Sequence, residues 1–305
     1  MISFIKLVRF KNLLILVLAQ LLVKYAFLEP LKSQTSLNAF GITLLILATI
    51  CIAAAGNIIN DIYDVNTDAI NKPNQVIIGK AISEKNAFTA FIILNIIGVG
   101  CGFYLSHLVN KPPFFILFVL ISLLLYVYTT MLKRLPIIGN ILISILVGFS
   151  ILIVGIFDLL PGLTPANKHF QLAFLKIIFK YAVFAFSINL LRELCKDIED
   201  YQGDFQQNMK TLPILIGIKN AKYLLSALNF VPLVLIILHV SNQLYLYPWA
   251  VGYFLIFIVA PLLYICIITF SASNKSDFSK LSNRYKIVML FGILSLLLYK
   301  FVILK

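Results

Sequence analysis

Residues 37–59 read LNAFGITLLILATICIAAAGNII, and this stretch contains no charged side chain. A transmembrane helix needs about 20 consecutive, mostly apolar residues to cross the hydrocarbon core of a bilayer. The stretch has that length and that composition, so it predicts a membrane-spanning helix. Directly after it, at Asn60-Asp61, the chain becomes acidic.

The rest of the chain has the same apolar character. Of its 305 residues, 61% are hydrophobic and 12% are charged, whereas an average soluble domain is about half apolar and about a quarter charged. This composition excludes an ordinary soluble enzyme. The predicted spans cover residues 12–29, 37–59, 86–108, 113–131, 136–157, 170–191, 221–240, 247–270 and 286–303. We therefore expect an all-α polytopic membrane protein, with nine transmembrane helices in a single bundle around a central cavity and one domain over residues 1–305.

The distribution of basic residues predicts the orientation of this bundle. The chain has 25 Lys and Arg against 12 Asp and Glu, and the N-terminus and the even-numbered loops hold 17 of the 25. Cytoplasmic loops carry an excess of Lys and Arg. We expect an integral protein of the cell (inner or plasma) membrane, with the N-terminus and the long loops 60–85 and 192–220 in the cytoplasm. Lys24 and Lys176 lie near the ends of spans, where their ammonium groups can snorkel to water.

Acidic residues concentrate in those two long loops. Eight of the 12 lie in the short stretches 61–68 and 193–204. The aspartates of the two stretches are Asp61, Asp64 and Asp68 and, at the same spacing, Asp197, Asp200 and Asp204. Positions three and four apart share one face of a helix. Each stretch is therefore expected to project a stripe of carboxylates from a helix end.

These stripes indicate a site for a hard cation. Like charges on one stripe repel one another, and a bound cation removes that repulsion. Oxygen ligands without thiol or imidazole favour Mg²⁺ or Ca²⁺, and Mg²⁺ is commonly held by carboxylates together with substrate phosphates. The chemistry predicted is a diphosphate bridged by Mg²⁺ between the two stripes. The alternative is that two polar loops on one side of a membrane merely present solvated acidic faces.

At these residues the chain resembles the UbiA superfamily of intramembrane prenyltransferases. The family's motifs follow its second and sixth helices, and here they read Asn60-Asp61-x-x-Asp64-x-x-x-Asp68 and Asp197-x-x-Asp200-x-x-x-Asp204. The stretch from Arg192 to Asp204, RELCKDIEDYQGD, leads to KTLPI at 210–214 and is similar to that of geranylgeranylglycerol-phosphate geranylgeranyltransferases. The chain departs from many members at Asn74-Gln75-Val76, where these have an acid-Arg-Pro sequence.

The resemblance implies that a polyprenyl diphosphate ionises at its allylic C1–O bond and that the cation alkylates an acceptor. The implied ligands of Mg²⁺ are Asn60, Asp61, Asp64, Asp68, Asp197, Asp200 and Asp204. Among them, the implied catalytic residues are Asp64, Asp68, Asp197 and Asp200. The candidates for contact with the diphosphate are Arg9, Lys72, Lys133 and Arg134, which are alternatively explained as topology signals.

The allylic cation needs a dry cavity and aromatic faces. The candidate rings are Tyr63, Tyr128 and Tyr181, although aromatic residues in spanning helices also serve as packing or interface residues. A hydroxyl acceptor would lose a proton to Asp197 or Glu199, and the sequence does not select between them. Asn140 and Asn189 fall in spanning segments, where polar residues are either functional or hydrogen-bonded between helices.

The sequence leaves alternatives open for the identity of the acceptor and for the class of function. The leading acceptor is geranylgeranylglyceryl phosphate in ether-lipid synthesis, and the second is an aromatic compound of menaquinone or ubiquinone synthesis. An ion-coupled transporter is a more distant alternative, because intramembrane acids also mark ion pathways. The partners expected are a prenyl diphosphate, the acceptor and membrane lipids, with no nucleic acid and no obligate protein partner. Gly98-x-Gly100-x-Gly102 lies inside a predicted span, so it indicates close helix packing rather than a dinucleotide site.

Overall fold

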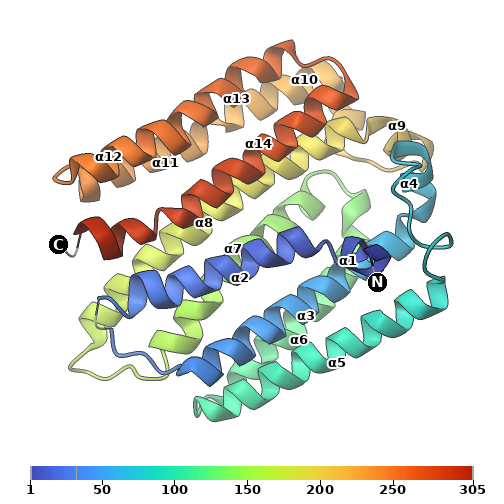
Figure 1. Cartoon of the computed structure of the whole chain (residues 1–305). Helices are drawn as coiled ribbons and strands as arrows, with labels where there is room; N and C mark the ends of the chain where they lie inside the picture. The colour runs from blue at the N-terminus through green and yellow to red at the C-terminus, as the bar shows by residue number, and fades with distance from the viewer. Residues whose placement is uncertain (1, 32, 304–305) are drawn as a thin grey trace.

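A computed structural model describes residues 2–31 and 33–303, and this part of the chain is helical throughout, with no β-strand (Figure 1). Nine of its helical segments are long and apolar enough to cross a membrane. In chain order they are α2 (Phe10–Leu22) with η1 (Val23–Leu28), α3 (Ala39–Tyr63), α5 (Glu84–Leu108), η2 (Pro112–Phe114) with α6 (Phe115–Thr130), α7 (Ile138–Leu159), α8 (Lys168–Glu199), α10 (Leu212–Leu228) with α11 (Phe230–His239) and η4 (Val240–Leu244), α12 (Pro248–Phe254) with η5 (Leu255–Val259) and α13 (Ala260–Ser271), and α14 (Lys275–Leu294) with η6 (Tyr299–Ile303). The prediction of an all-α, nine-span protein is confirmed.

The long helix α8 lies between two halves of the bundle. It has 32 residues and is about 48 Å long at about 1.5 Å per residue. One buried apolar cluster joins α8 to the helices before it, and a second joins it to the helices that follow. Figure 1 shows α8 in the middle, with α3, α5 and α6 on one side and α10 to α13 on the other.

The two ends of the bundle differ in their short elements. At one end lie α1 (Ile2–Leu7), α4 (Val65–Asn71), η3 (Leu132–Arg134) and α9 (Tyr201–Gln206). Figure 1 shows α4 and α9 beside each other near the N-terminus, while the C-terminus lies at the opposite end. We call the end that carries α4 and α9 the acidic end, because both aspartate motifs fall there.

The glycines at 98–102 pack helices together. A Cβ atom added to Gly98 would lie 2.7 Å from Ile52 Cγ1, and one added to Gly102 would lie 2.3 Å from the ring of Phe118. Gly100 has no atom within 4 Å of such a position. Two of the three glycines therefore allow close approach of α5 to its neighbours, as the sequence indicated.

Three predicted boundaries differ from the structure by eight residues or more. The sixth span continues beyond residue 191 to Glu199, the seventh begins at Leu212 rather than 221, and the ninth begins at Lys275 rather than 286. Hydropathy alone stops at the first charges of α8, but Glu193 pairs with both Arg192 and Lys196, so the helix continues through them. This extension places the first part of the second aspartate motif on α8 itself.

A buried ion pair lies in the half of the bundle that is farther from the acidic end. Lys24 is 1% exposed and its Nζ lies 3.0 Å from Asp158 Oδ2, while Asp158 is 0% exposed. Lys24 also donates to the Leu37 carbonyl, and Asp158 accepts from the Leu37 amide at 2.7 Å. The expectation that Lys24 snorkels to water is therefore wrong, because a carboxylate and a carbonyl solvate its ammonium inside the protein.

We expect Lys24→Ala to lower the free energy of unfolding by about 3–5 kcal/mol, because it leaves the buried Asp158 carboxylate unpaired. Chemical unfolding of the purified protein in detergent micelles measures this. Lys176→Ala removes an exposed lysine from α8 and serves as the control, with an expected change below about 0.5 kcal/mol. Equal effects of the two substitutions would show that the pair contributes nothing specific.

Candidate active site

Both aspartate motifs have the same local structure. Helix α3 ends at Tyr63 and α4 begins at Val65, so Asp64 lies at a break with φ −92° and ψ 0°. Asp200 lies at the equivalent break between α8 and α9, with φ −97° and ψ 9°. The expected uninterrupted stripe is therefore corrected: in each motif the helix turns at the central aspartate, and the third aspartate is carried by a separate short helix.

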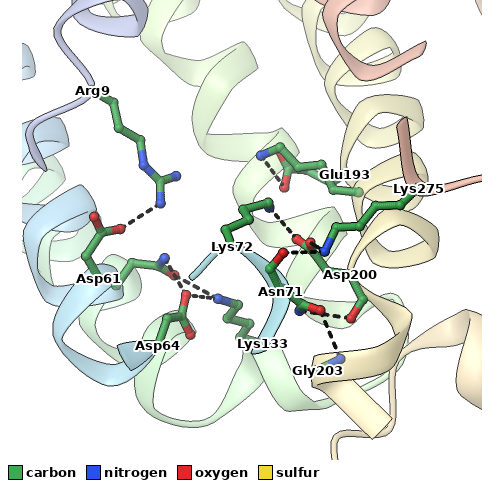
Figure 2. Close-up of polar contacts among 12 residues, drawn as sticks. Arg9, Asp61, Asp64, Asn71, Lys72, Lys133, Glu193, Asp200, Gly203 and Lys275 are labelled. Carbon is green, nitrogen blue, oxygen red and sulfur yellow. Dashed lines mark hydrogen bonds and ion pairs between the residues drawn. The ribbon is translucent and has the colours of Figure 1, made fainter. Parts of the chain in front are cut away.

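The short helices α4 and α9 join the two motifs. The Asn71 side chain of α4 donates to the Asp200 carbonyl at 3.0 Å and accepts from the Gly203 amide at 2.9 Å. Position 203 must be glycine for this contact, because an added Cβ would lie 2.4 Å from Asn71 Nδ2. Residues 129 positions or more apart are thus held side by side at the acidic end (Figure 2).

Cations pair with the carboxylates of the first motif. Arg9 Nη2 lies 2.8 Å from Asp61 Oδ1, and Lys133 forms an ion pair with Asp64. Asn60 donates to Asp64 Oδ2 at 2.7 Å and accepts from Lys133. Arg9 adopts a left-handed backbone conformation, with φ 54°, at the break between α1 and α2. Such backbone strain in a non-glycine residue is often found at functional sites.

The second motif has matching partners. Lys72 Nζ lies 2.8 Å from Asp200 Oδ2, and Lys275 Nζ lies 4.0 Å from Asp200 Oδ1. Asn140 of α7 donates to Asp197 Oδ2 at 2.9 Å, which gives this intramembrane asparagine a place in the site. Figure 2 shows Lys72 and Lys275 directed at Asp200 from different segments of the chain. Predicted diphosphate-contacting lysines thus lie on both motifs.

Burial and mutual repulsion raise the pKa values of two of these carboxyl groups. Burial, together with the neighbouring Asp64, raises the pKa of Asp68 to about 6. Burial and Asp200 raise the pKa of Asp204 to about 7, and Asp64 of the first motif contributes to that shift. The carboxylates of the two motifs therefore interact electrostatically, as one cluster of excess negative charge.

The donor set of this cluster fits a hard cation. In the described part of the chain, no three His, Cys, Asp or Glu side chains are already grouped to hold a metal ion. Asp64 and Asp200 are instead paired with lysines, and Asp200 Oδ1 is buried without a hydrogen-bond partner. An orphaned carboxylate oxygen, two carboxyl groups with raised pKa values and purely oxygen donors are the features that Mg²⁺ satisfies.

The three tyrosines predicted to stabilise the allylic cation lie in different surroundings. Tyr128 of α6 lies close enough to Asp64 and Asp197 to interact with them electrostatically. Tyr63 is 49% exposed on the outside of α3. Tyr181 is hydrogen-bonded to Ser295, and it precedes Asp197 by 16 residues, or about 24 Å of helix. We therefore retain Tyr128 alone as the aromatic candidate of this site.

The structure also gives the surroundings of Arg134 and of the two candidate bases, Asp197 and Glu199. Arg134 is exposed, and of the described residues none forms an ion pair with it. Glu199 interacts with Ser279 of α14 and with Lys72, whereas Asp197 is held by Asn140. Both candidate bases are half-buried, and Asp197 is the one that is hydrogen-bonded to α7.

A second group of cations lies beside the carboxylates, and the sequence analysis did not assign it. Arg192 Nη1 and Lys196 Nζ both contact Glu193 Oε1, at 2.8 and 2.9 Å, and Arg192 Nε is buried without a partner. Lys286 of α14 donates to Asn12 and lies within electrostatic reach of Arg192. The spacing of four between Arg192 and Lys196 on a helix was the available signal. Lys286 is distant in sequence, so only the fold shows that it belongs to this group.

Comparison with known proteins identifies relatives over nearly the whole chain. The profile of the UbiA prenyltransferase family matches residues 16–299. Digeranylgeranylglyceryl phosphate synthase of Methanosphaera stadtmanae is 32% identical over 287 residues, which cover 88% of this chain and 97% of that protein. A solved digeranylgeranylglyceryl phosphate synthase shares the fold with a TM-score of 0.64 and 24% identity, covering 97% of this chain and 98% of its own. A UbiA homolog from Archaeoglobus fulgidus, solved with GPP and Mg²⁺, has a TM-score of 0.52 and 14% identity, covering 96% and 99%.

The raised pKa values predict that cation binding depends on pH. A carboxyl group must be deprotonated to bind a metal ion, so protonation of Asp204 near pH 7 and of Asp68 near pH 6 opposes binding. We expect the Mn²⁺ dissociation constant, measured by electron paramagnetic resonance, to rise as the pH falls from 8 to 5.5. The rise is about tenfold per pH unit below each pKa.

Asp204→Asn serves as the matched variant for this titration. At pH 8 this variant should bind Mn²⁺ more weakly than the unsubstituted protein. The rise of the dissociation constant near pH 7 should be absent, whereas the rise near pH 6 should remain. A dissociation constant that is unchanged across the pH range would contradict this account of the carboxylate cluster.

Proposed function

This chain belongs to the UbiA prenyltransferase family, and on that premise we propose that it transfers a geranylgeranyl group from its diphosphate to geranylgeranylglyceryl phosphate in ether-lipid synthesis. The observation that carries the proposal is the meeting of two aspartate motifs at one end of the bundle, tied together by Asn71. Relatives named digeranylgeranylglyceryl phosphate synthase support the choice of acceptor. Membership of a prenyltransferase family removes the transporter alternative.

The reaction depends on Mg²⁺ in this proposal. In this proposal one ion is held by Asn60, Asp64 and Asp68, with Asp61 nearby, and a second by Asp197, Asp200 and Asp204. When bound, the two ions would supply positive charge that stabilises the leaving diphosphate as its bond to carbon breaks. The structure of a UbiA homolog with GPP and Mg²⁺ supports this cofactor.

Other residues of the site orient the diphosphate, accept the hydroxyl proton and stabilise the allylic cation. Lys72 and Lys133 are positioned on the two motifs to turn from Asp200 and Asp64 onto phosphate oxygens, so that they orient the diphosphate. The allylic C1–O bond to diphosphate then breaks, and a bond forms between C1 and the hydroxyl oxygen of the acceptor. The hydroxyl proton passes to Asp197, which Asn140 holds in place. Tyr128 presents an aromatic ring near the carboxylates, where it stabilises the allylic cation.

The neighbouring cations favour an acceptor that carries a phosphate. Among the described residues, Arg9, Arg192, Lys196 and Lys286 form ion pairs with only two carboxylates, those of Asp61 and Glu193. A phosphate monoester carries a charge between −1.5 and −2, by analogy with phosphorylated side chains at about pH 7. Its charge therefore balances this excess better than the single carboxylate of an aromatic acceptor. Arg192 Nε, which is buried and unpaired, is a donor available for it.

The orientation and the domain organisation complete the proposal. The chain is an integral membrane protein. We place its acidic end and its N-terminus on the cytoplasmic side of the cell membrane, because the loops at that end hold most of the Lys and Arg. All spans form one domain in this proposal, since α8 shares buried apolar contacts with both halves of the bundle.

We expect Asp64→Ala and Asp200→Ala each to reduce turnover at least about a thousandfold, because each removes a carboxylate at the centre of one motif. Formation of the product from labelled geranylgeranyl diphosphate measures turnover, and helical content of the purified variant shows that it is folded. Glu84→Ala, at the exposed start of α5, is the matched loss of an acid and should leave turnover unchanged. Full activity of both aspartate variants would overturn the enzymatic proposal.

We expect Arg192→Gln to raise the KM for geranylgeranylglyceryl phosphate about tenfold or more, with little change in the KM for the prenyl diphosphate, because one charge-assisted contact to the acceptor phosphate is lost. Lys219→Gln changes an exposed lysine and serves as the control. In the same assay, prenylation of a hydroxybenzoate or naphthoate but not of the glycerol phosphate would contradict the proposed acceptor.

A further inference from the structure

A cavity lies at the end of the bundle opposite the acidic end. It has a volume of about 330 Å³ and is formed by α8, α11, α12 and α14. Of the α8 residues that line it, Phe184 lies nearest to Asp197 and precedes it by 13 residues, so about 20 Å of helix separates this cavity from the aspartates. Figure 1 shows α11 and α12 at the opposite end of the molecule from α4 and α9. The cavity is therefore distinct from the proposed active site.

The size and the lining of this cavity are those of a ligand site. Ligand pockets have volumes of about 300–1,000 Å³ and are mostly apolar, with a few convergent polar groups. Here Phe184, Leu235, Phe254 and Ile258 contribute apolar walls. The polar groups on the walls are Lys180, Tyr181, His239, Asn242 and Ser295.

His239 is the polar group that most needs a ligand. Both of its ring nitrogens are buried and neither makes a hydrogen bond of good geometry; the side chain of Gln243 lies close to the ring. By contrast, Tyr181 and Ser295 already pair with each other at 2.9 Å, and the Ser295 hydroxyl donates to the Gly292 carbonyl. Buried polar groups in folded proteins are otherwise almost always hydrogen-bonded, and ionisable residues inside membrane spans are often functional. A ligand that bonds to the imidazole would satisfy it.

The local backbone is irregular at the same place. The π-helical segment Val240–Leu244 follows directly after His239, and the π-helical segment Leu255–Val259 follows directly after Phe254. Segments of π-helix inside α-helices are rare and are frequently found at functional sites. Two of them thus flank one cavity, on neighbouring spans.

The charged residues that line the cavity indicate the kind of ligand that it would bind. Lys180 lies on the wall, close enough to His239 to interact with it electrostatically. No carboxylate lines the cavity, and among residues 2–31 and 33–303 none forms an ion pair with Lys180. At one side of an apolar space, an ammonium without a counter-charge and an imidazole that can donate a hydrogen bond match an anionic head group on a hydrocarbon chain.

We propose that this cavity binds an anionic single-chain lipid, with its chain between α8 and α11 and its carboxylate or phosphate on Lys180 and His239. The site lies within the membrane spans, so the lipid would enter from the bilayer. The proposal does not depend on the acceptor or the reaction proposed above.

The test uses the full-length protein in nanodiscs and palmitate that carries a photoreactive diazirine on its chain. We expect saturable labelling of the peptides that contain residues 179–184 or 235–242, located by mass spectrometry. A hexadecanol probe and a hexadecyl trimethylammonium probe with the same diazirine should label these peptides about tenfold less, because they lack the negative charge. Competition by unlabelled palmitate and by hexadecyl phosphate then identifies which head group binds more tightly.

Matched variants test the two polar contacts. Lys180→Gln and His239→Leu should each reduce labelling about tenfold, and His239→Gln, which keeps a hydrogen-bond donor, should retain more of it. Lys168→Gln and His107→Leu change exposed residues of the same types and should leave labelling unchanged. Prenyl transfer should continue in all five variants, which shows that they are folded.

Three results would overturn the proposal. The first is labelling that does not saturate or that is equal for all three probes, since this indicates only nonspecific partition. The second is full labelling of both Lys180→Gln and His239→Leu. The third is displacement of the palmitate probe by geranylgeranyl diphosphate with Mg²⁺, because the cavity would then hold the tail of the prenyl donor.

Discussion

The repulsion among carboxylates at the acidic end is the constraint on which the rest of the site depends. Six aspartates of two motifs lie at the edge of an apolar bundle, and burial and mutual repulsion raise the pKa values of Asp68 and Asp204. Such a cluster persists only when cations neutralise it. Lysines pair with Asp64 and Asp200 in the structure, and a metal-bound diphosphate would satisfy the same carboxylates while bringing the reacting bond into place.

The fold creates this cluster through two equivalent breaks. Asp64 and Asp200 each end a long spanning helix and turn the chain into a short one, so that α4 and α9 contact each other at the acidic end. Asn71 and Gly203 fix their separation. Because α8 packs against both halves of the bundle, its end positions the second motif relative to the first. The opposite end, with Lys24 and Asp158, has its own buried charges and no part in this cluster.

Much of this arrangement could be predicted from the sequence. Hydropathy located all nine spans, and the repeated spacing of aspartates identified both motifs and their resemblance to a family that the comparisons confirm. The helix breaks could not be predicted, because the spacing 0, 3, 7 also fits one continuous helix. Lys286 and Lys275 reach the site only through tertiary packing, and the same holds for the pairing of Lys24 with Asp158.

The central claim is that both motifs act on one diphosphate. The most direct measurement is electron paramagnetic resonance of Mn²⁺ bound to the purified protein with an unreactive thio-analogue of geranylgeranyl diphosphate. The account predicts two Mn²⁺ ions with a spin-coupled spectrum, and loss of that coupling in either Asp64→Ala or Asp200→Ala. A spectrum of isolated, uncoupled Mn²⁺, unchanged when one motif is removed, would contradict it.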